Sequence, residues 1–194
     1  VVQGSILGSW LFLLFYNSIA YLDLEAKLFL YADDSVLVNI HDNCDKIDER
    51  ICNDMKIVIN YLNEKKLMLN AEKTNFMIIQ QTGTKADNTE AIKIESKDSD
   101  STRIRGSYVI KRVREMRYLG LIIDDNLKWD AHIRSVQKKI SNATAILWKM
   151  RKSLPKETKK LIYKSLVETH LTYLITLWGS APETAIETLQ VTQN

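Results

Sequence analysis

Two adjacent aspartates, Asp33 and Asp34, stand between short apolar runs and are the side chains in this sequence best suited to chemistry. The runs 27–31 and 35–38 are rich in aromatic and β-branched residues, a pattern that predicts a β-hairpin with a polar tip. Two carboxylates held close together repel each other, and a divalent cation between them relieves the repulsion. Mg²⁺ prefers oxygen ligands and is commonly held by one or two carboxylates plus substrate phosphates. The pair therefore predicts a magnesium-binding tip, with an ordinary Asp-Asp turn as the alternative.

The periodicity around this hairpin predicts a mixed unit of helices and strands. The apolar segment 6–22 predicts a helix buried on most of its faces rather than a membrane span, because it is short and contains small and polar residues. Apolar residues at helical spacing over 47–62 predict an amphipathic helix. Strands are expected at 67–70, 76–79 and, most clearly, 118–123.

The charge of the chain is divided unevenly, although its net charge is only +3. Residues 1–100 contain ten Lys and Arg against sixteen Asp and Glu, whereas residues 111–165 contain fifteen against five. The basic part coincides with two predicted amphipathic helices, one capped by Asp130 and one beginning near Pro155. Such a surface suits a polyanionic partner, although solvated helix faces on a stable domain have the same composition.

The remaining features give little sign of further chemistry. Cys44 and Cys52 have no ligand spacing for zinc around them, so free thiols in a reducing compartment are expected. The polar segment 82–107 predicts a surface insertion with room for one hairpin. No secretory leader pattern is evident, which predicts an intracellular protein without a transmembrane segment.

Four sequence blocks, found in order, resemble the reverse transcriptase of non-LTR (LINE-like) retrotransposons, particularly of the jockey kind. One block alone is weak support, but four at plausible spacing make a specific match. Beyond residue 130 the resemblance is looser. The blocks are Gln3-Gly4-Ser5-Ile6-Leu7-Gly8 with Leu11-Phe12, Tyr31-Ala32-Asp33-Asp34, Leu69-Asn70-Ala71-Glu72-Lys73-Thr74, and Tyr118-Leu119-Gly120-Leu121-Ile122-Ile123-Asp124.

The resemblance implies an α+β fold of fingers, palm and thumb. Residues 1–124 would form a partial reverse-transcriptase palm, an antiparallel sheet with packed helices, that carries the polar insertion at about 82–107. Residues 125–194 would form a helical region like a thumb or connection. Its basic helices would follow the backbone of a nucleic-acid duplex.

The resemblance also implies roles for individual residues in an RNA-directed DNA polymerase. Asp33 and Asp34 would be catalytic carboxylates that bind two Mg²⁺ ions about 3.5–4 Å apart. The substrates would be an RNA template, a DNA primer and a deoxynucleoside triphosphate. Lys73 would lie near the triphosphate, with a solvated turn lysine as the alternative. The other contacts would be Gln3, Gly4, Ser5, Tyr31 and Ala32 to nucleotide and template, and Tyr118, Leu119 and Gly120 as the primer grip.

Some positions depart from the family pattern. The family places its first catalytic aspartate on a strand upstream of the Gln3 block, so we expect that carboxylate and the fingers to come from an N-terminal portion of the same polyprotein. Isolated, the 194 residues are expected to be inactive. Val1-Val2 and Ser9-Trp10 also replace proline-containing segments of the family. A non-catalytic nucleic-acid-binding module and a decayed transposon remnant are therefore the alternative functions.

Overall fold

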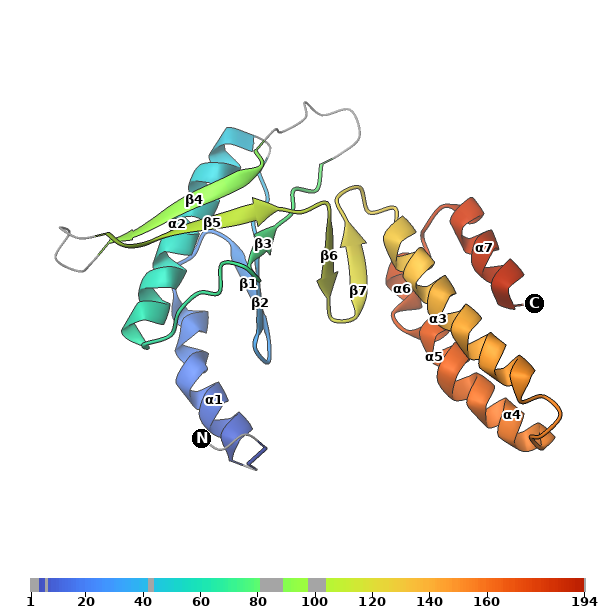
Figure 1. Cartoon of the computed structure of the whole chain (residues 1–194). Helices are drawn as coiled ribbons and strands as arrows, with labels where there is room; N and C mark the ends of the chain where they lie inside the picture. Colours follow the sequence, from blue (N-terminus) through green and yellow to red (C-terminus); the bar gives the residue numbers. More distant parts are fainter. Residues whose placement is uncertain (1–3, 6, 42–43, 81–88, 98–103, 194) are drawn as a thin grey trace. The chain divides into compact units, whose positions relative to one another are not determined.

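The chain forms two compact units, described by a computed structural model (Figure 1). Unit 1 comprises residues 1–76 and 85–112, and unit 2 comprises residues 77–84 and 113–194. The boundary at Arg112 precedes the expected one at 124, because the last two strands belong with the helices that follow them. The assignment of the units to a palm and a thumb stays a prediction. The structure describes residues 4–5, 7–41, 44–80, 89–97 and 104–193.

Unit 1 combines a long helix, a hairpin and a small sheet, so the predicted mixture of α and β structure is confirmed. Strands β1 and β2 pair antiparallel. The order of the second sheet is β3-β5-β4, with β3 parallel and β4 antiparallel to β5. The elements are α1 (Gly8–Tyr16), the 3₁₀ helix η1 (Asn17–Tyr21), β1 (Lys27–Tyr31), β2 (Asp34–Val38), α2 (Cys44–Glu64), β3 (Asn75–Phe76), β4 (Ala91–Lys97) and β5 (Ile104–Arg112).

Helix α2 carries the core of unit 1 on two faces, which confirms the helix predicted from apolar spacing. Met55 and Ile59 pack against β4 and β5, and Leu37 of the hairpin joins this cluster. Val58 and Leu62 pack against η1 and the hairpin. The helix therefore holds the β1–β2 hairpin and the three-stranded sheet in one hydrophobic core.

The segments that follow α2 differ from the sequence prediction. Residues 67–70 form no strand, and the strand expected at 76–79 is only the two-residue β3, which pairs with β5. Within the segment expected to be a surface insertion, Ile92 and Ile94 are buried. They alternate with exposed residues, so one side of β4 faces the core although its composition is polar.

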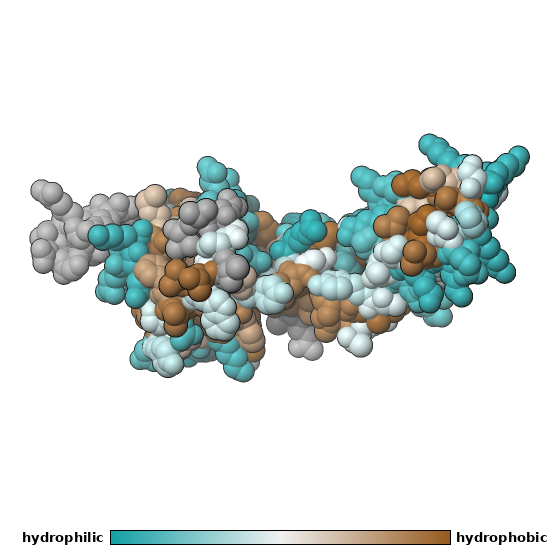
Figure 2. Space-filling view, turned by 90° about the horizontal axis from the view of Figure 1, so that it is seen from below, coloured by the Kyte–Doolittle hydropathy of each residue, from teal (hydrophilic) through white to brown (hydrophobic). Residues whose placement is uncertain are grey.

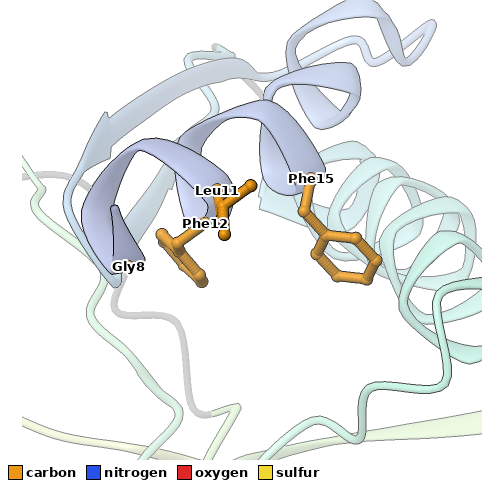
Figure 3. Close-up of a pocket in the computed structure, with 4 residues that line it drawn as sticks. All are labelled: Gly8, Leu11, Phe12 and Phe15. Carbon is orange, nitrogen blue, oxygen red and sulfur yellow. The ribbon is translucent and has the colours of Figure 1, made fainter. Parts of the chain in front are cut away.

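Helix α1 is exposed, so the predicted burial on most of its faces is wrong for this structure. None of its residues is buried, and Trp10 and Leu14 are 68% and 74% exposed. An open apolar hollow of about 540 Å³ lies along it (Figure 3) and is lined by Gly8, Leu11, Phe12 and Phe15. Figure 2 shows apolar side chains in brown at the surface of both units. Among the described residues, no helix combines the length and apolarity needed to cross a membrane.

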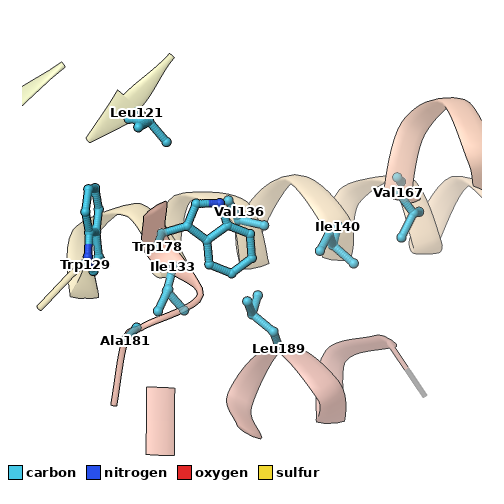
Figure 4. Packing of buried hydrophobic residues seen from close by; sticks show 10 residues of the cluster. Leu121, Trp129, Ile133, Val136, Ile140, Val167, Trp178, Ala181 and Leu189 are labelled. Carbon is cyan, nitrogen blue, oxygen red and sulfur yellow. The ribbon is translucent and has the colours of Figure 1, made fainter. Parts of the chain in front are cut away.

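Unit 2 packs helices around the long helix α3. Its core joins Val136 and Ile140 of α3 to Val167, Trp178 and Leu189 of the helices that follow (Figure 4). The elements are β6 (Glu115–Tyr118), β7 (Leu121–Asp124), α3 (Asp130–Lys149), α4 (Lys156–Tyr163), the π-helix η2 (Lys164–Glu168), α5 (Thr169–Thr172), α6 (Ile175–Trp178) and α7 (Glu183–Gln193).

Two local predictions for unit 2 need correction. The strand expected at 118–123 is instead a β-hairpin whose turn is Leu119-Gly120. Asp130 is the first residue of α3 rather than its cap, which is Trp129 at φ 64°. In the second basic helix Leu161 is exposed, whereas Val167 is buried. Val167 lies in the π-helical turn η2, whose wider turn changes which side chains meet the core.

Candidate active site

The carboxylates predicted to bind metal lie at the tip of the β1–β2 hairpin. Tyr31 pairs with Asp34, which leaves Ala32 and Asp33 as a two-residue loop. Ala32 has φ 53°, a backbone conformation that costs an L-residue about 1–2 kcal/mol and that tight hairpin turns require at the first loop position. Asp33 and Asp34 are both exposed. The turn therefore presents two carboxylates to solvent at one end of the hairpin.

A buried carboxylate on α2 anchors the other end of the hairpin. Asp54 is only 2% exposed, and its two oxygens accept hydrogen bonds from the backbone N–H groups of Glu25 at 3.0 Å and Ala26 at 2.8 Å. Arg50, one turn earlier on α2, pairs its Nε with the Glu25 carboxylate at 2.8 Å. These residues directly precede β1, so α2 fixes where the strand begins.

A second tether lies beside the tip. Tyr16, at the end of α1, shares a hydrogen bond of 3.2 Å with the hydroxyl of Ser35, the residue after the aspartates. The Tyr16 ring stacks on Phe12 with centroids 5.4 Å apart, and its backbone carbonyl accepts a hydrogen bond from Tyr61 at 3.3 Å. α1 is thereby linked to the aspartate hairpin through an aromatic cluster.

The predicted nucleotide and template residues are only partly described. Gln3 lies outside the described residues. Gly4 has φ 83°, and a Cβ added there would meet nothing within 4 Å, so the backbone conformation is its clearest requirement for glycine. Ser5 has a buried hydroxyl for which no hydrogen-bond partner is found among the described residues. Tyr31 is 62% exposed beside the tip.

Lys73 lies in a turn that Asn70 organises. The Asn70 carbonyl accepts hydrogen bonds from the backbone N–H of Thr74 at 3.0 Å and from its hydroxyl at 2.8 Å, and the Asn70 side chain accepts one from the Lys73 N–H at 3.2 Å. The turn leaves the Lys73 side chain exposed. A fixed backbone with an exposed cation fits both the predicted triphosphate contact and the alternative of a solvated lysine.

The predicted primer grip belongs to unit 2 and forms the tight turn between β6 and β7. Tyr118 pairs with Leu121 across the turn, and both loop residues have positive φ, Leu119 at 45° and Gly120 at 84°. The Tyr173 hydroxyl donates a hydrogen bond of 2.7 Å to the Leu119 carbonyl. The conformation at φ 84° favours glycine, and a Cβ there would also make a tight contact of 3.3 Å with the Tyr173 ring.

The donor chemistry of the hairpin tip suits a divalent cation. Asp33 and Asp34 offer exposed carboxylate oxygens, the ligands that Mg²⁺ prefers. Within the described part of the chain, no group of three or more acidic, His or Cys side chains could hold a metal. Two carboxylates are fewer ligands than Mg²⁺ takes, so any such ion would also need substrate phosphates, water or further carboxylates.

Three residues that support these turns were not found from sequence: Asp54, Tyr16 and Tyr173. Asp54 carried a usable signal, because it lies three residues after Ile51 and four before Val58 on the apolar stripe of α2. A carboxylate at such a position must find buried donors. Tyr16 and Tyr173 bond to partners 19 and 54 residues away, and no local pattern marks such contacts.

Comparisons with known proteins identify the family of the chain. Residues 1–123 match the family model described as reverse transcriptase (RNA-dependent DNA polymerase), and the chain therefore belongs to that family. It is also similar to the RNA-directed DNA polymerase from mobile element jockey of Drosophila funebris, with 32% identity over 100 residues. That similarity covers 50% of this chain and 11% of the relative, and it supports the resemblance to non-LTR, jockey-like elements. No solved structure matches the chain.

Proposed function

We propose that the chain supplies the Asp33-Asp34 part of the catalytic site of an RNA-directed DNA polymerase, together with a surface for its nucleic acid. The observation that carries the proposal is the exposed aspartate pair on a tight, doubly tethered turn, in a chain of the reverse transcriptase family. Asp33 and Asp34 would bind Mg²⁺ in a two-metal site. When bound, such ions activate the primer 3′-hydroxyl and stabilise the leaving pyrophosphate.

The chain's own residues would position the substrates around these carboxylates. Tyr31 and Ala32 would form the floor beneath the incoming deoxynucleoside triphosphate, and Gly4 and Ser5, with Gln3, would approach the template. Lys73 would lie near the triphosphate, where its charge offsets the charge that develops during transfer. The exposed side chain of Lys73 and the positive φ of Gly4 support these roles.

Other segments of the full-length polymerase would complete the site and cover α1. The large apolar exposure of α1 supports this, since surfaces of this kind mark interaction sites. A further carboxylate for the two-metal site would come from the same N-terminal segments. The matched segment makes up only 11% of the jockey polymerase, which fits a catalytic site built from this segment together with other parts of a longer chain.

Unit 2 would hold the primer and template duplex. Residues 131–167 contain ten Lys and Arg and one Glu, a dense cationic region on α3 and the helices after it. Duplex phosphates attract such a surface, and the affinity should fall as salt rises because counterions are released. The Leu119-Gly120 turn, held by Tyr173, would support the primer terminus.

Primer extension on an RNA template tests the proposal. In the full-length polymerase that contains this segment, Asp33→Asn should lower Mg²⁺-dependent extension by about 10³-fold or more, because metal stabilisation of several kcal/mol is lost. Asp23→Asn, an exposed aspartate before β1, should leave extension unchanged. Wild-type extension by the Asp33→Asn polymerase would refute the catalytic role.

A further inference from the structure

Trp148, near the end of α3, is exposed, whereas tryptophan side chains are on average largely buried. Its exposed fraction is 65%, and it lies off the buried stripe of α3 that includes Ile140 and Ala143. Core packing within unit 2 therefore does not explain it. An indole exposed to this extent offers a large flat apolar face to a partner.

Arg151 holds the indole in place. Its guanidinium lies 3.9 Å from the centroid of the Trp148 ring, and its Nη1 donates a hydrogen bond of 3.1 Å to the Trp148 carbonyl. The Arg151 carbonyl in turn accepts a hydrogen bond from Lys159 Nζ at 3.1 Å. These contacts restrict both side chains before any ligand arrives, which lowers the entropic cost of binding.

The surroundings of this pair are strongly cationic. Residues 149–164 contain seven Lys and Arg against one acidic residue, Glu157. In a chain of the reverse transcriptase family a nucleic acid is the partner that this combination favours, because its bases match the apolar face and its phosphates match the charge. Bases inside a duplex have their faces covered by their neighbours, so an unpaired base is the form that can stack on an indole.

We propose that Trp148 and Arg151 form a stacking platform for an unpaired base of single-stranded nucleic acid, with the lysines of 149–164 contacting its phosphates. The inference rests on the proposed nucleic-acid role of unit 2 and adds a site to it. The base lies against the open face of the indole, opposite the guanidinium. RNA and DNA share this chemistry, since every base has a π-face.

The test compares short fluorescent oligonucleotides with abasic oligomers of the same length, which keep the phosphates and lack the bases. Affinities are measured by fluorescence anisotropy on the full 194-residue chain, in DNA and RNA versions. The wild-type chain should bind the oligomers with bases about tenfold more tightly than the abasic ones, because each stacked base adds favourable free energy. Trp148→Ala should reduce this ratio to about one, and Trp148→Phe should restore part of it.

Trp10→Ala is the matched control, because Trp10 is 68% exposed and lies on α1 of the other unit. It should keep the wild-type ratio. A Trp148→Ala chain with the wild-type ratio, or a wild-type chain that binds both oligomers equally, would overturn the platform. If DNA alone or RNA alone shows the Trp148-dependent ratio, the platform stands and its nucleic acid is identified.

Duplex binding, measured with the same variants, separates this inference from the proposed function. Trp148→Ala should leave salt-dependent duplex affinity close to wild type, since phosphate contacts supply it. Duplex affinity that is absent or independent of salt would refute the proposed duplex role of unit 2, whatever the base ratio shows.

Discussion

The β1–β2 and β6–β7 hairpins are built alike, but their aspartate pairs have different surroundings. Each hairpin closes on a two-residue loop, with positive φ at Ala32 in the first loop and at both Leu119 and Gly120 in the second. Each strand pair includes one member of an Asp-Asp sequence. Asp33 and Asp34 are exposed at a tip. Asp124 is 7% exposed at the open end of its hairpin, and its Oδ1 accepts a hydrogen bond of 2.7 Å from the Lys128 N–H.

The difference lies in which residues fix each hairpin. Asp124 uses its carboxylate to organise the turn that leads into α3, a structural role that fills its hydrogen-bonding capacity in part. The carboxylates of the first hairpin are exposed, and that hairpin is tethered through Asp54 and Tyr16 instead. Support by other residues leaves the tip carboxylates available for a cation.

The largest effect is expected at the base of the first hairpin. Asp54→Ala should destabilise unit 1 by about 2–5 kcal/mol, because two buried N–H groups lose their acceptor. Denaturant unfolding measures the loss, and hydrogen exchange at Glu25 and Ala26 locates it. Asp48→Ala, on the same helix, is the control and should cost less. Wild-type stability in Asp54→Ala would show that the anchor is unimportant.

The turn of the second hairpin should be the next most sensitive. Gly120→Ala should cost about 1–2 kcal/mol, because alanine disfavours φ 84° and its Cβ would meet the Tyr173 ring. Tyr173→Phe removes only the hydrogen bond to Leu119 and should cost about 1 kcal/mol. Equal midpoints for Gly120→Ala and the wild type in denaturant unfolding would contradict the account of this turn.

Lowering the pH should reduce the free energy of unfolding of unit 2, because His132 becomes protonated. Burial, and to a smaller extent the charge of Lys139, lowers the pKa of His132 below its usual value. Its Nδ1 accepts a hydrogen bond from the Ile122 N–H of β7 at 3.3 Å, so protonation would break that contact. The unfolded chain takes up the proton near pH 6.5, about its usual pKa, while the folded chain resists it. Stability should therefore fall as the pH drops below about 6.5.

Unfolding midpoints between about pH 8 and pH 5 measure this effect. In His132→Asn, an amide oxygen can accept the Ile122 hydrogen bond without titrating, and the pH dependence should become shallower. Identical profiles for the variant and the wild type would assign the acid sensitivity to other groups.

The smallest effect is expected at the first turn. Ala32→Gly should relieve the cost of φ 53° but add freedom to the unfolded chain, for a net stabilisation between zero and about 1 kcal/mol. Glycine is therefore expected to be the more stable residue in both turns, and only the second turn contains it. A clear destabilisation by Ala32→Gly in denaturant unfolding would mean that the alanine methyl has a packing role.

Sequence reasoning succeeded where the signal was local. The apolar runs around Asp33 predicted both strands of the first hairpin, and helical spacing predicted α2 and α3. The prediction of one strand at 118–123 was wrong, because Gly120 at positive φ turns the chain within an otherwise apolar run. The 82–107 segment was predicted to be a surface insertion because its composition is polar. In β4 only alternate residues are apolar, yet these few side chains are enough to pack one side of the strand against the core.

The two carboxylates could be predicted from the sequence, but the residues that hold them in place could not. The Asp-Asp dipeptide and its neighbours mark the tip, but the residues that hold the tip act through contacts distant in sequence. The exposure of α1 could not be predicted either, because an apolar helix buried by its own unit and one awaiting a partner have the same composition. Two identical dipeptides, at 33–34 and 124–125, differ only in what surrounds them.

The most direct test of the central claim is the effect of Mn²⁺, as a paramagnetic substitute for Mg²⁺, on the amide NMR signals of the chain. Low Mn²⁺ should broaden the signals of residues 31–35 selectively, and Asp33→Asn with Asp34→Asn should abolish that broadening. Asp124 and Asp125 should not form a second centre of broadening at the same Mn²⁺ concentration, because Asp124 is buried and hydrogen-bonded. Broadening that centres on residues 124–125, or that persists without the tip carboxylates, would contradict the assignment of the metal to the first hairpin.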